Sequence, residues 1–168
     1  MKKVTFKGQP VHIVHDLPPV GKDAPFFKLT GTDLQDRSLK DFEGQTLVLN
    51  IFPSLDTPVC AASVRKFNEL AAQWNNTKVL AVSRDLPFAH ARFCSTEGIE
   101  NLINLSDYKT CDFGLVYGLE MSDGPLEKLL ARAVIIIDKD GKIAYTQLVP
   151  EITDEPDYDD VLRFLKTL

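Results

Sequence analysis

Two short runs of almost uninterrupted apolar residues limit the fold more than any other feature of this chain. They cover residues 46–52 and 79–83. Strands with one face in water alternate apolar and polar side chains, whereas strands covered on both faces are apolar at nearly every position. The sequence therefore predicts a central sheet that lies between layers of helices.

The segments around these runs predict helices and a hairpin. Apolar residues recur at helical spacing after the first run, at Val64, Phe67, Ala71 and Trp74. A second helix is expected to begin near residues 85–87 and to end at Gly98. Residues 133–137 and 142–146 flank the turn at 138–141, which is a hairpin signal. Two buried strands joined by a helix form a parallel pair with a right-handed crossover.

Shorter segments complete the predicted topology. The remaining expected strands lie at residues 4–6, 11–14, 26–29, near Ser38 and at 102–105, and the remaining expected helices at 111–119 and 158–168. We therefore expect residues 1–168 to form a single domain of the α/β class. Its predicted architecture is a thioredoxin-like fold, a mixed central β-sheet flanked by helices, with an N-terminal β-hairpin extension.

Composition and charge exclude several kinds of partner. The formal net charge is −5 and the chain has no basic cluster, so we expect no binding to nucleic acid or to a membrane. No apolar run approaches the roughly 18–20 residues that a membrane span needs. Residues 1–8 contain two lysines but no apolar segment follows them, so no secretion signal is predicted and we expect a cytoplasmic protein.

The three cysteines, Cys60, Cys94 and Cys111, form neither a disulfide framework nor a zinc site by their spacing. Their number is odd, and no two of them are spaced as C-x-x-C. The histidines are not spaced with them as zinc ligands would be, and we expect no metal and no cofactor. The thiols are therefore either inert core residues, or at least one of them is reactive.

The segment that follows the first apolar run places Cys60 at the start of a helix. Thr57 suits the N-cap and Pro58 suits the first helical position, N1, which puts Cys60 at N3. Free N–H groups and the helix dipole at this end favour a thiolate over a thiol, and the thiolate is the nucleophile. A turn at the carboxyl end of a central strand is also where α/β folds commonly build their sites.

These residues carry a family resemblance. Pro53-x-x-x-Thr57-x-x-Cys60 resembles the active-site motif of the peroxiredoxins, and residues 50–67 resemble its bacterial thiol peroxidase branch. Further resembling segments lie at residues 85–89, 92–94, 123–126, 131–134 and 151–158, so the likeness covers nearly the whole chain. It implies a thiol-specific peroxidase of the atypical two-cysteine type, in which both redox cysteines lie in one chain.

The resemblance also implies roles for single residues. Cys60 matches the peroxidatic cysteine, Thr57 the residue that hydrogen-bonds the peroxide, and Pro53 the residue that shields the sulfur from water. Arg132 matches an arginine that supports the thiolate and the peroxide oxygens. From the residue pattern alone, Arg132 is expected to be a solvated charge at the mouth of a strand.

Cys94 matches the resolving cysteine of that branch, which condenses with the sulfenic acid of Cys60 to form a disulfide. Cys111 has no counterpart and is expected to be a bystander. A disulfide needs its two Cα atoms within roughly 4.4–6.8 Å. Cysteines inside two packed helices rarely meet this condition, so we expect residues 56–62, 90–97 or both to unwind after oxidation. Pro58 departs from many relatives and is expected to stiffen the first of these segments.

The resemblance implies hydrogen peroxide and alkyl or lipid hydroperoxides as substrates, thioredoxin as reductant and a homodimer as the assembly. Two other functions share the fold. A dithiol–disulfide oxidoreductase is disfavoured because C-x-x-C is missing, and a redox sensor differs from an enzyme by its lack of turnover. Of the remaining features, we expect His90 to be solvated, residues 138–141 to be a hairpin turn rather than a calcium loop, and the acidic stretch 154–160 to be a solvated loop and helix start.

Overall fold

The two apolar runs form neighbouring strands in the middle of a seven-stranded sheet. The structure, a computed structural model, describes residues 2–168. Strand β5 (Thr46–Ile51) pairs in parallel with β6 (Thr77–Ser83) and antiparallel with β8 (Ala133–Ile137). The strand order is β4-β3-β7-β6-β5-β8-β9, and both flanks of the parallel core end in antiparallel strands. The predicted mixed sheet is confirmed.

The other elements follow the predicted order. The remaining strands are β1 (Lys3–Phe6), β2 (Gln9–His12), β3 (Lys28–Gly31), β4 (Asp36–Ser38), β7 (Ile103–Ser106) and β9 (Ile143–Leu148). The helices are the short 3-10 helix η1 (Leu39–Phe42), α1 (Pro58–Ala71), α2 (Pro87–Glu97), α3 (Asp112–Val116) and α4 (Tyr158–Leu165). β1 and β2 form a separate two-stranded sheet, which is the predicted N-terminal hairpin. Within residues 2–168, no helix combines the length and the apolar composition that a membrane span requires.

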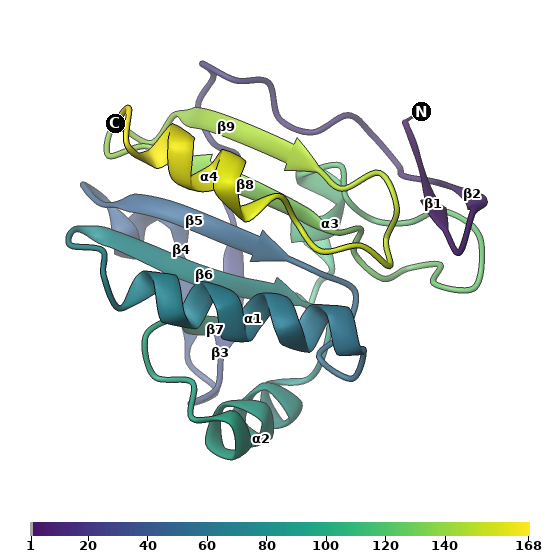
Figure 1. The fold of residues 1–168 in the computed structure, drawn as a ribbon, viewed down its shortest axis with the longest axis horizontal. Coiled ribbons are helices and arrows are strands. Elements are labelled where there is room, and N and C mark those ends of the chain that lie inside the picture. The colour runs from purple at the N-terminus through teal and green to yellow at the C-terminus, as the bar shows by residue number, and fades with distance from the viewer. Residues whose placement is uncertain (1) are drawn as a thin grey trace.

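Helices cover both faces of the sheet, so the core has two layers. In Figure 1, α1 and α4 lie across one face, and α3 lies behind the other. On the first face, Phe67 of α1 and Val161 of α4 pack against Val48 and Val134 of the central strands. On the second face, Phe113 belongs to a larger cluster that also contains side chains of the N-terminal hairpin. Every residue of β8 is buried, as its unbroken apolar sequence predicts.

Several element boundaries differ from the predictions, and three of these differences have a clear structural reason. The strand expected at residues 26–29 lies at Lys28–Gly31, where Thr30 and Gly31 pair with β7. Residues 39–42 form a 3-10 helix, because the side chain of Asp41 accepts from the backbone N–H of Ser38 in a capping box. The helix expected at 111–119 is shorter, because Cys111 and Gly118 both have positive φ angles, 60° and 73°.

Candidate active site

The first turn of α1 has the predicted cap. Thr57 is the N-cap with an extended backbone, Pro58 occupies N1, and the Cys60 N–H donates to the Thr57 hydroxyl oxygen at 3.4 Å. The Thr57 hydroxyl donates in turn to the carbonyl of Ser54 at 3.0 Å. The turn lies where β5 ends and α1 begins (Figure 1). Pro53 is buried in the same turn.

Cys60 lies in a dry environment. Its exposed fraction is 0%, and it belongs to an apolar cluster with Phe52, Leu55 and Val64. The half-buried Cys94 packs against the same cluster from α2. Both cysteines are free thiols in this structure, as is Cys111. The fold therefore brings the two candidate redox cysteines to one cluster without joining them.

Arg132 lies against the sulfur of Cys60. It directly precedes β8, is 1% exposed, and its Nη2 lies 3.2 Å from Cys60 Sγ. Its Nε donates to the carbonyl of Ile152 at 3.0 Å, and its Nη1 has no acceptor among residues 2–168. The expectation from the residue pattern, a solvated charge, is wrong because the loop that carries Ile152 covers the side chain. A buried guanidinium is costly unless it meets an anion, so this contact favours a thiolate at Cys60.

Two polar residues that the sequence reasoning missed hold the same helix turn. Ser63 donates its hydroxyl to the carbonyl of Cys60 at 2.8 Å and accepts from Nδ2 of Asn50 at 3.2 Å. Both side chains are fully buried. The signal was present in the sequence, since Asn50 is the only amide within the first apolar run. A polar side chain inside a covered strand has to find a partner, and here that partner supports Cys60.

Cys94 has a different environment from Cys60. Its sulfur donates to Oδ1 of Asn104 on β7 at 3.1 Å. Burial raises the pKa of this thiol above its ordinary value, so at neutral pH it is protonated. Cys111 lies outside the apolar cluster, next to α3, where its sulfur is 3.9 Å from the carbonyl of Tyr108.

His90 is buried, which contradicts the expectation that it is solvated. Its exposed fraction is 0%, because α2 turns this face toward β6 and β7. One ring nitrogen lies 3.0 Å from the Ser83 hydroxyl and the other lies 2.9 Å from Nδ2 of Asn104. Burial lowers the pKa of His90 to about 4, and the nearby Asp85 carboxylate only partly opposes this shift. The ring is therefore neutral at pH 7.

The other two features that the sequence set aside have the expected form. Residues 138–141 form a hairpin turn, in which Asp138 accepts from the backbone N–H groups of Asp140 and Lys142. The acidic stretch is mostly exposed, and Asp157 caps α4 by accepting from the N–H of Asp160.

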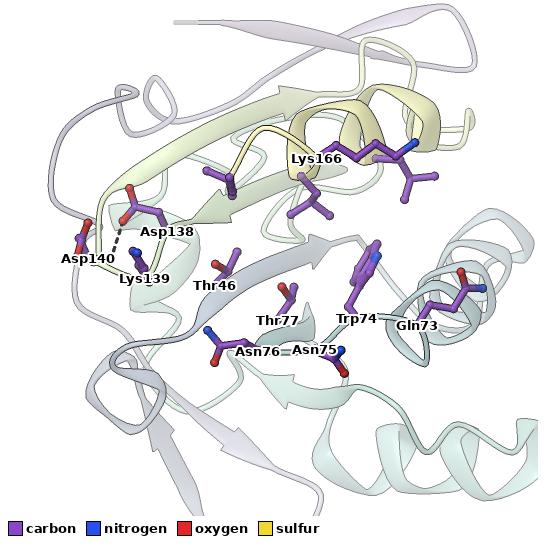
Figure 2. A pocket seen from close by; sticks show the side chains of 13 residues that line it. Thr46, Gln73, Trp74, Asn75, Asn76, Thr77, Asp138, Lys139, Asp140 and Lys166 are labelled. Atoms are coloured by element: carbon purple, nitrogen blue, oxygen red, sulfur yellow. Dashed lines mark hydrogen bonds between the residues drawn. The ribbon is translucent and has the colours of Figure 1, made fainter.

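A surface pocket of about 630 Å³ has none of the three cysteines in its lining, and Figure 2 shows the residues that line it. Thr46 and Thr77, which begin β5 and β6, line it, whereas Cys60 follows the other end of β5. Charged side chains of Asp138, Lys139 and Lys166 surround it, and none of the candidate site residues belongs to it. The pocket and Cys60 therefore lie at opposite ends of β5.

Comparisons with known proteins cover nearly the full chain. Residues 19–162 match the family model described as Redoxin. The thiol peroxidase of Corynebacterium glutamicum is 53% identical over 165 residues, which are 98% of this chain and 99% of that protein. The thiol peroxidase of Mycobacterium tuberculosis is 51% identical over the same shares of both chains. The crystal structure of a peroxiredoxin-like protein from Aquifex aeolicus has a TM-score of 0.94 at 44% identity, covering 99% of this chain and 97% of that chain.

Proposed function

Since the chain belongs to the thiol peroxidase branch of the peroxiredoxins, within the redoxin family, we propose that Cys60 is the cysteine that attacks the peroxide. The protein is an enzyme that reduces peroxides by means of thiols. The contact between Arg132 and Cys60, 3.2 Å long and excluded from water, is the single observation that carries the assignment. Among the three cysteines, Cys60 is the one whose sulfur a buried guanidinium contacts within residues 2–168, whereas the buried side chain of Arg84 reaches only the backbone carbonyl of Cys111.

In the first step, the Cys60 thiolate attacks the terminal oxygen of the hydroperoxide and the O–O bond breaks. The leaving oxygen takes a proton and departs as water or an alcohol, and the sulfur is oxidised to a sulfenic acid. Arg132 has a free Nη1 donor beside the sulfur for the charge that moves onto the leaving oxygen. In this proposal the Thr57 hydroxyl, which accepts from the Cys60 N–H, hydrogen-bonds the peroxide, and the buried Pro53 keeps water from the sulfur.

In the second step, the sulfur of Cys94 attacks the sulfenic sulfur of Cys60. An S–S bond forms, and the sulfenic hydroxyl leaves with the thiol proton as water. Cys60 and Cys94 both lie within helices, so residues 56–62, 90–97 or both leave their helical conformation for this step. An external dithiol of the thioredoxin type then reduces the disulfide by thiol–disulfide exchange. Hydrogen peroxide and organic hydroperoxides are the proposed substrates.

One assay tests the cysteine assignments. Hydroperoxide consumption is driven by NADPH, thioredoxin reductase and thioredoxin and measured for the wild type, Cys60→Ser, Cys94→Ser and Cys111→Ser. Cys60→Ser is expected to lose turnover, Cys94→Ser to lose sustained turnover with this reductant, and Cys111→Ser to match the wild type. Turnover that survives in Cys60→Ser removes the main proposal. Full turnover in Cys94→Ser together with a loss in Cys111→Ser assigns the resolving role to Cys111.

We also propose a homodimer in the cytoplasm. Three free thiols suit a reducing compartment. Leu86 and Phe88 are 51% and 66% exposed at the start of α2, close to the active-site turn, and apolar side chains of this size favour an interface. Sedimentation equilibrium tests the assembly: the wild type is expected to be a dimer and Phe88→Glu a monomer. A monomeric wild type would remove this part of the proposal.

A further inference from the structure

A continuous chain of hydrogen bonds leads from Cys94 into the interior. Cys94 Sγ is 3.1 Å from Oδ1 of Asn104, and Nδ2 of Asn104 is 2.9 Å from Nδ1 of His90. Nε2 of His90 is 3.0 Å from the hydroxyl of Ser83, which donates to Oδ2 of Asp85 at 2.6 Å. Asn104 is 4% exposed, and His90 and Ser83 are fully buried, so water does not compete for the bonds among these three side chains.

A second branch leads from the same carboxylate to the active-site turn. Oδ1 of Asp85 accepts from the hydroxyl of Ser54 at 2.9 Å, and Oδ2 accepts from the backbone N–H of Leu55 at 2.8 Å. The carbonyl of Ser54 accepts the Thr57 hydroxyl, and Thr57 caps the turn that holds Cys60. The Asp85 carboxylate is therefore the junction between the segment of Cys60 and the segment of Cys94.

The carboxylate also determines the direction of every bond in the Cys94 branch. Asp85 can only accept, so the single hydroxyl proton of Ser83 points to it, and Ser83 has to accept from Nε2 of His90. The neutral ring then has an unprotonated Nδ1, which accepts a hydrogen bond from Nδ2 of Asn104. The amide of Asn104 thus turns its Oδ1 to Cys94, and this oxygen accepts a hydrogen bond from the S–H group of Cys94.

We infer that Asn104, His90 and Asp85 are positioning residues for the disulfide-forming step, because their hydrogen bonds hold Cys94 as a thiol on folded α2 and tie it to the Cys60 turn. The inference rests on the proposed resolving role of Cys94. While these hydrogen bonds are intact, the sulfur of Cys94 stays protonated and does not attack the sulfenic acid of Cys60. Unwinding of α2 frees its sulfur from Asn104. The raised pKa of Cys94 in the folded state agrees with this arrangement.

The network consequently affects how the sulfenic acid of Cys60 divides between two competing reactions. The sulfenic acid is either attacked by Cys94, with loss of water, or oxidised by a second hydroperoxide to a sulfinic acid, with release of water or an alcohol. A network that holds α2 folded slows the first reaction and leaves the second unaffected. Weakening it is expected to speed disulfide formation and to lower the yield of sulfinic acid.

The test uses single-turnover reactions with hydrogen peroxide, quenched at increasing times with an alkylating agent and dimedone, and followed by mass spectrometry. Asn104→Leu keeps the side-chain size but removes both hydrogen bonds of the amide. Loss of one net hydrogen bond corresponds to about a fivefold change in the equilibrium constant for local unfolding of the segment. Both bonds of Asn104 reach α2, so we expect Asn104→Leu to form the disulfide at least about fivefold faster and to yield at least about fivefold less sulfinic acid at a fixed peroxide concentration.

Two further variants separate this effect from general loss of stability. Leu105→Ala alters the next residue of β7, which points into the core of the opposite face, and is expected to keep the wild-type rate of disulfide formation despite a lower free energy of unfolding. His90→Gln keeps one acceptor and one donor in the chain, and is expected to form the disulfide within about twofold of the wild-type rate. It also provides a readout if Asn104→Leu does not fold.

The outcomes distinguish this inference from the proposed function. If the wild type forms no Cys60–Cys94 disulfide, the resolving role of Cys94 is wrong and the inference goes with it. If the disulfide forms but Asn104→Leu reacts at the wild-type rate, the network has no positioning role while the proposed function stands. An equal acceleration in Leu105→Ala, or a fivefold acceleration in His90→Gln, likewise overturns the inference.

Discussion

Arg132 carries a positive charge into an interior from which water is excluded. Two of its nitrogens are used, one on the sulfur of Cys60 and one on the carbonyl of Ile152, and the third has no acceptor among residues 2–168. Such a side chain stabilises an anion beside it and is destabilising once that anion is absent. The reactivity of Cys60 and the burial of Arg132 therefore depend on one another.

Replacing Arg132 is expected to act on the first chemical step. Arg132→Met removes the charge and both donors near the sulfur, and the second-order rate of peroxide attack is expected to fall by about 10²- to 10³-fold. Arg132→Lys keeps the charge but not the forked geometry, and its rate of peroxide attack is expected to lie between those of the wild type and Arg132→Met. Rapid-quench measurement of sulfenic acid formation gives these rates.

Arg163→Met is the matched control, since this arginine has a 68% exposed side chain on α4 and, within residues 2–168, pairs with Asp160 alone. It is expected to react like the wild type. The proposed role of Arg132 is contradicted if folded Arg132→Met, verified by circular dichroism, forms sulfenic acid as fast as the wild type.

The first turn of α1 has two opposing requirements. The Thr57 cap and the Ser63 hydrogen bond hold Cys60 at N3, where it contacts Arg132. Disulfide formation requires the same residue to leave this position. Pro58 fits N1 in the structure and restricts the unfolded turn, which favours the folded conformation. In the proposed mechanism, the element that activates Cys60 is therefore also the element that delays its resolution.

Hydrogen exchange of the reduced and disulfide forms tests the unwinding. In the disulfide form, amide protons of residues 56–62, 90–97 or both are expected to exchange at least tenfold faster, because their helical hydrogen bonds are lost. Amides of β5, which the reaction does not disturb, serve as the internal control. Unchanged protection of both segments in a fully formed Cys60–Cys94 disulfide would show that the helices need not unwind.

At the scale of the whole molecule, the polar network behind α2 links the stability of the fold to pH. Burial lowers the pKa of His90 to about 4, compared with about 6.5 in an unfolded chain. Between these values the unfolded state binds more protons than the folded state. The free energy of unfolding therefore falls as the pH falls from 6.5 to 4, and His90 contributes a loss of about 3 kcal/mol across that range.

Urea unfolding at pH 7 and pH 4.5 checks this expectation. The wild type is expected to lose about 2 kcal/mol more than His90→Gln between the two pH values, because Gln does not titrate. The carboxylates titrate in both proteins and cancel in the comparison. Equal losses in the two proteins would contradict a neutral, buried His90.

The local sequence determined the central strands and the cap of α1. Residues 46–52 and 79–83 predict covered strands by composition alone, and Thr57 and Pro58 place Cys60 at N3 by spacing alone. These features depend on neighbours within a few residues, because caps and strand patterns are local.

Only the tertiary structure decided which distant side chains meet Cys60 and Cys94. Arg132 and His90 both look like surface charges in the sequence, yet both are buried because segments far along the chain cover them. The network through Asp85 joins a turn, a helix and two strands, so its hydrogen bonds exist only after the sheet has formed. The local sequence pattern reflects only a residue's neighbours along the chain. The burial of a side chain and the identity of its hydrogen-bond partners depend on contacts between distant segments.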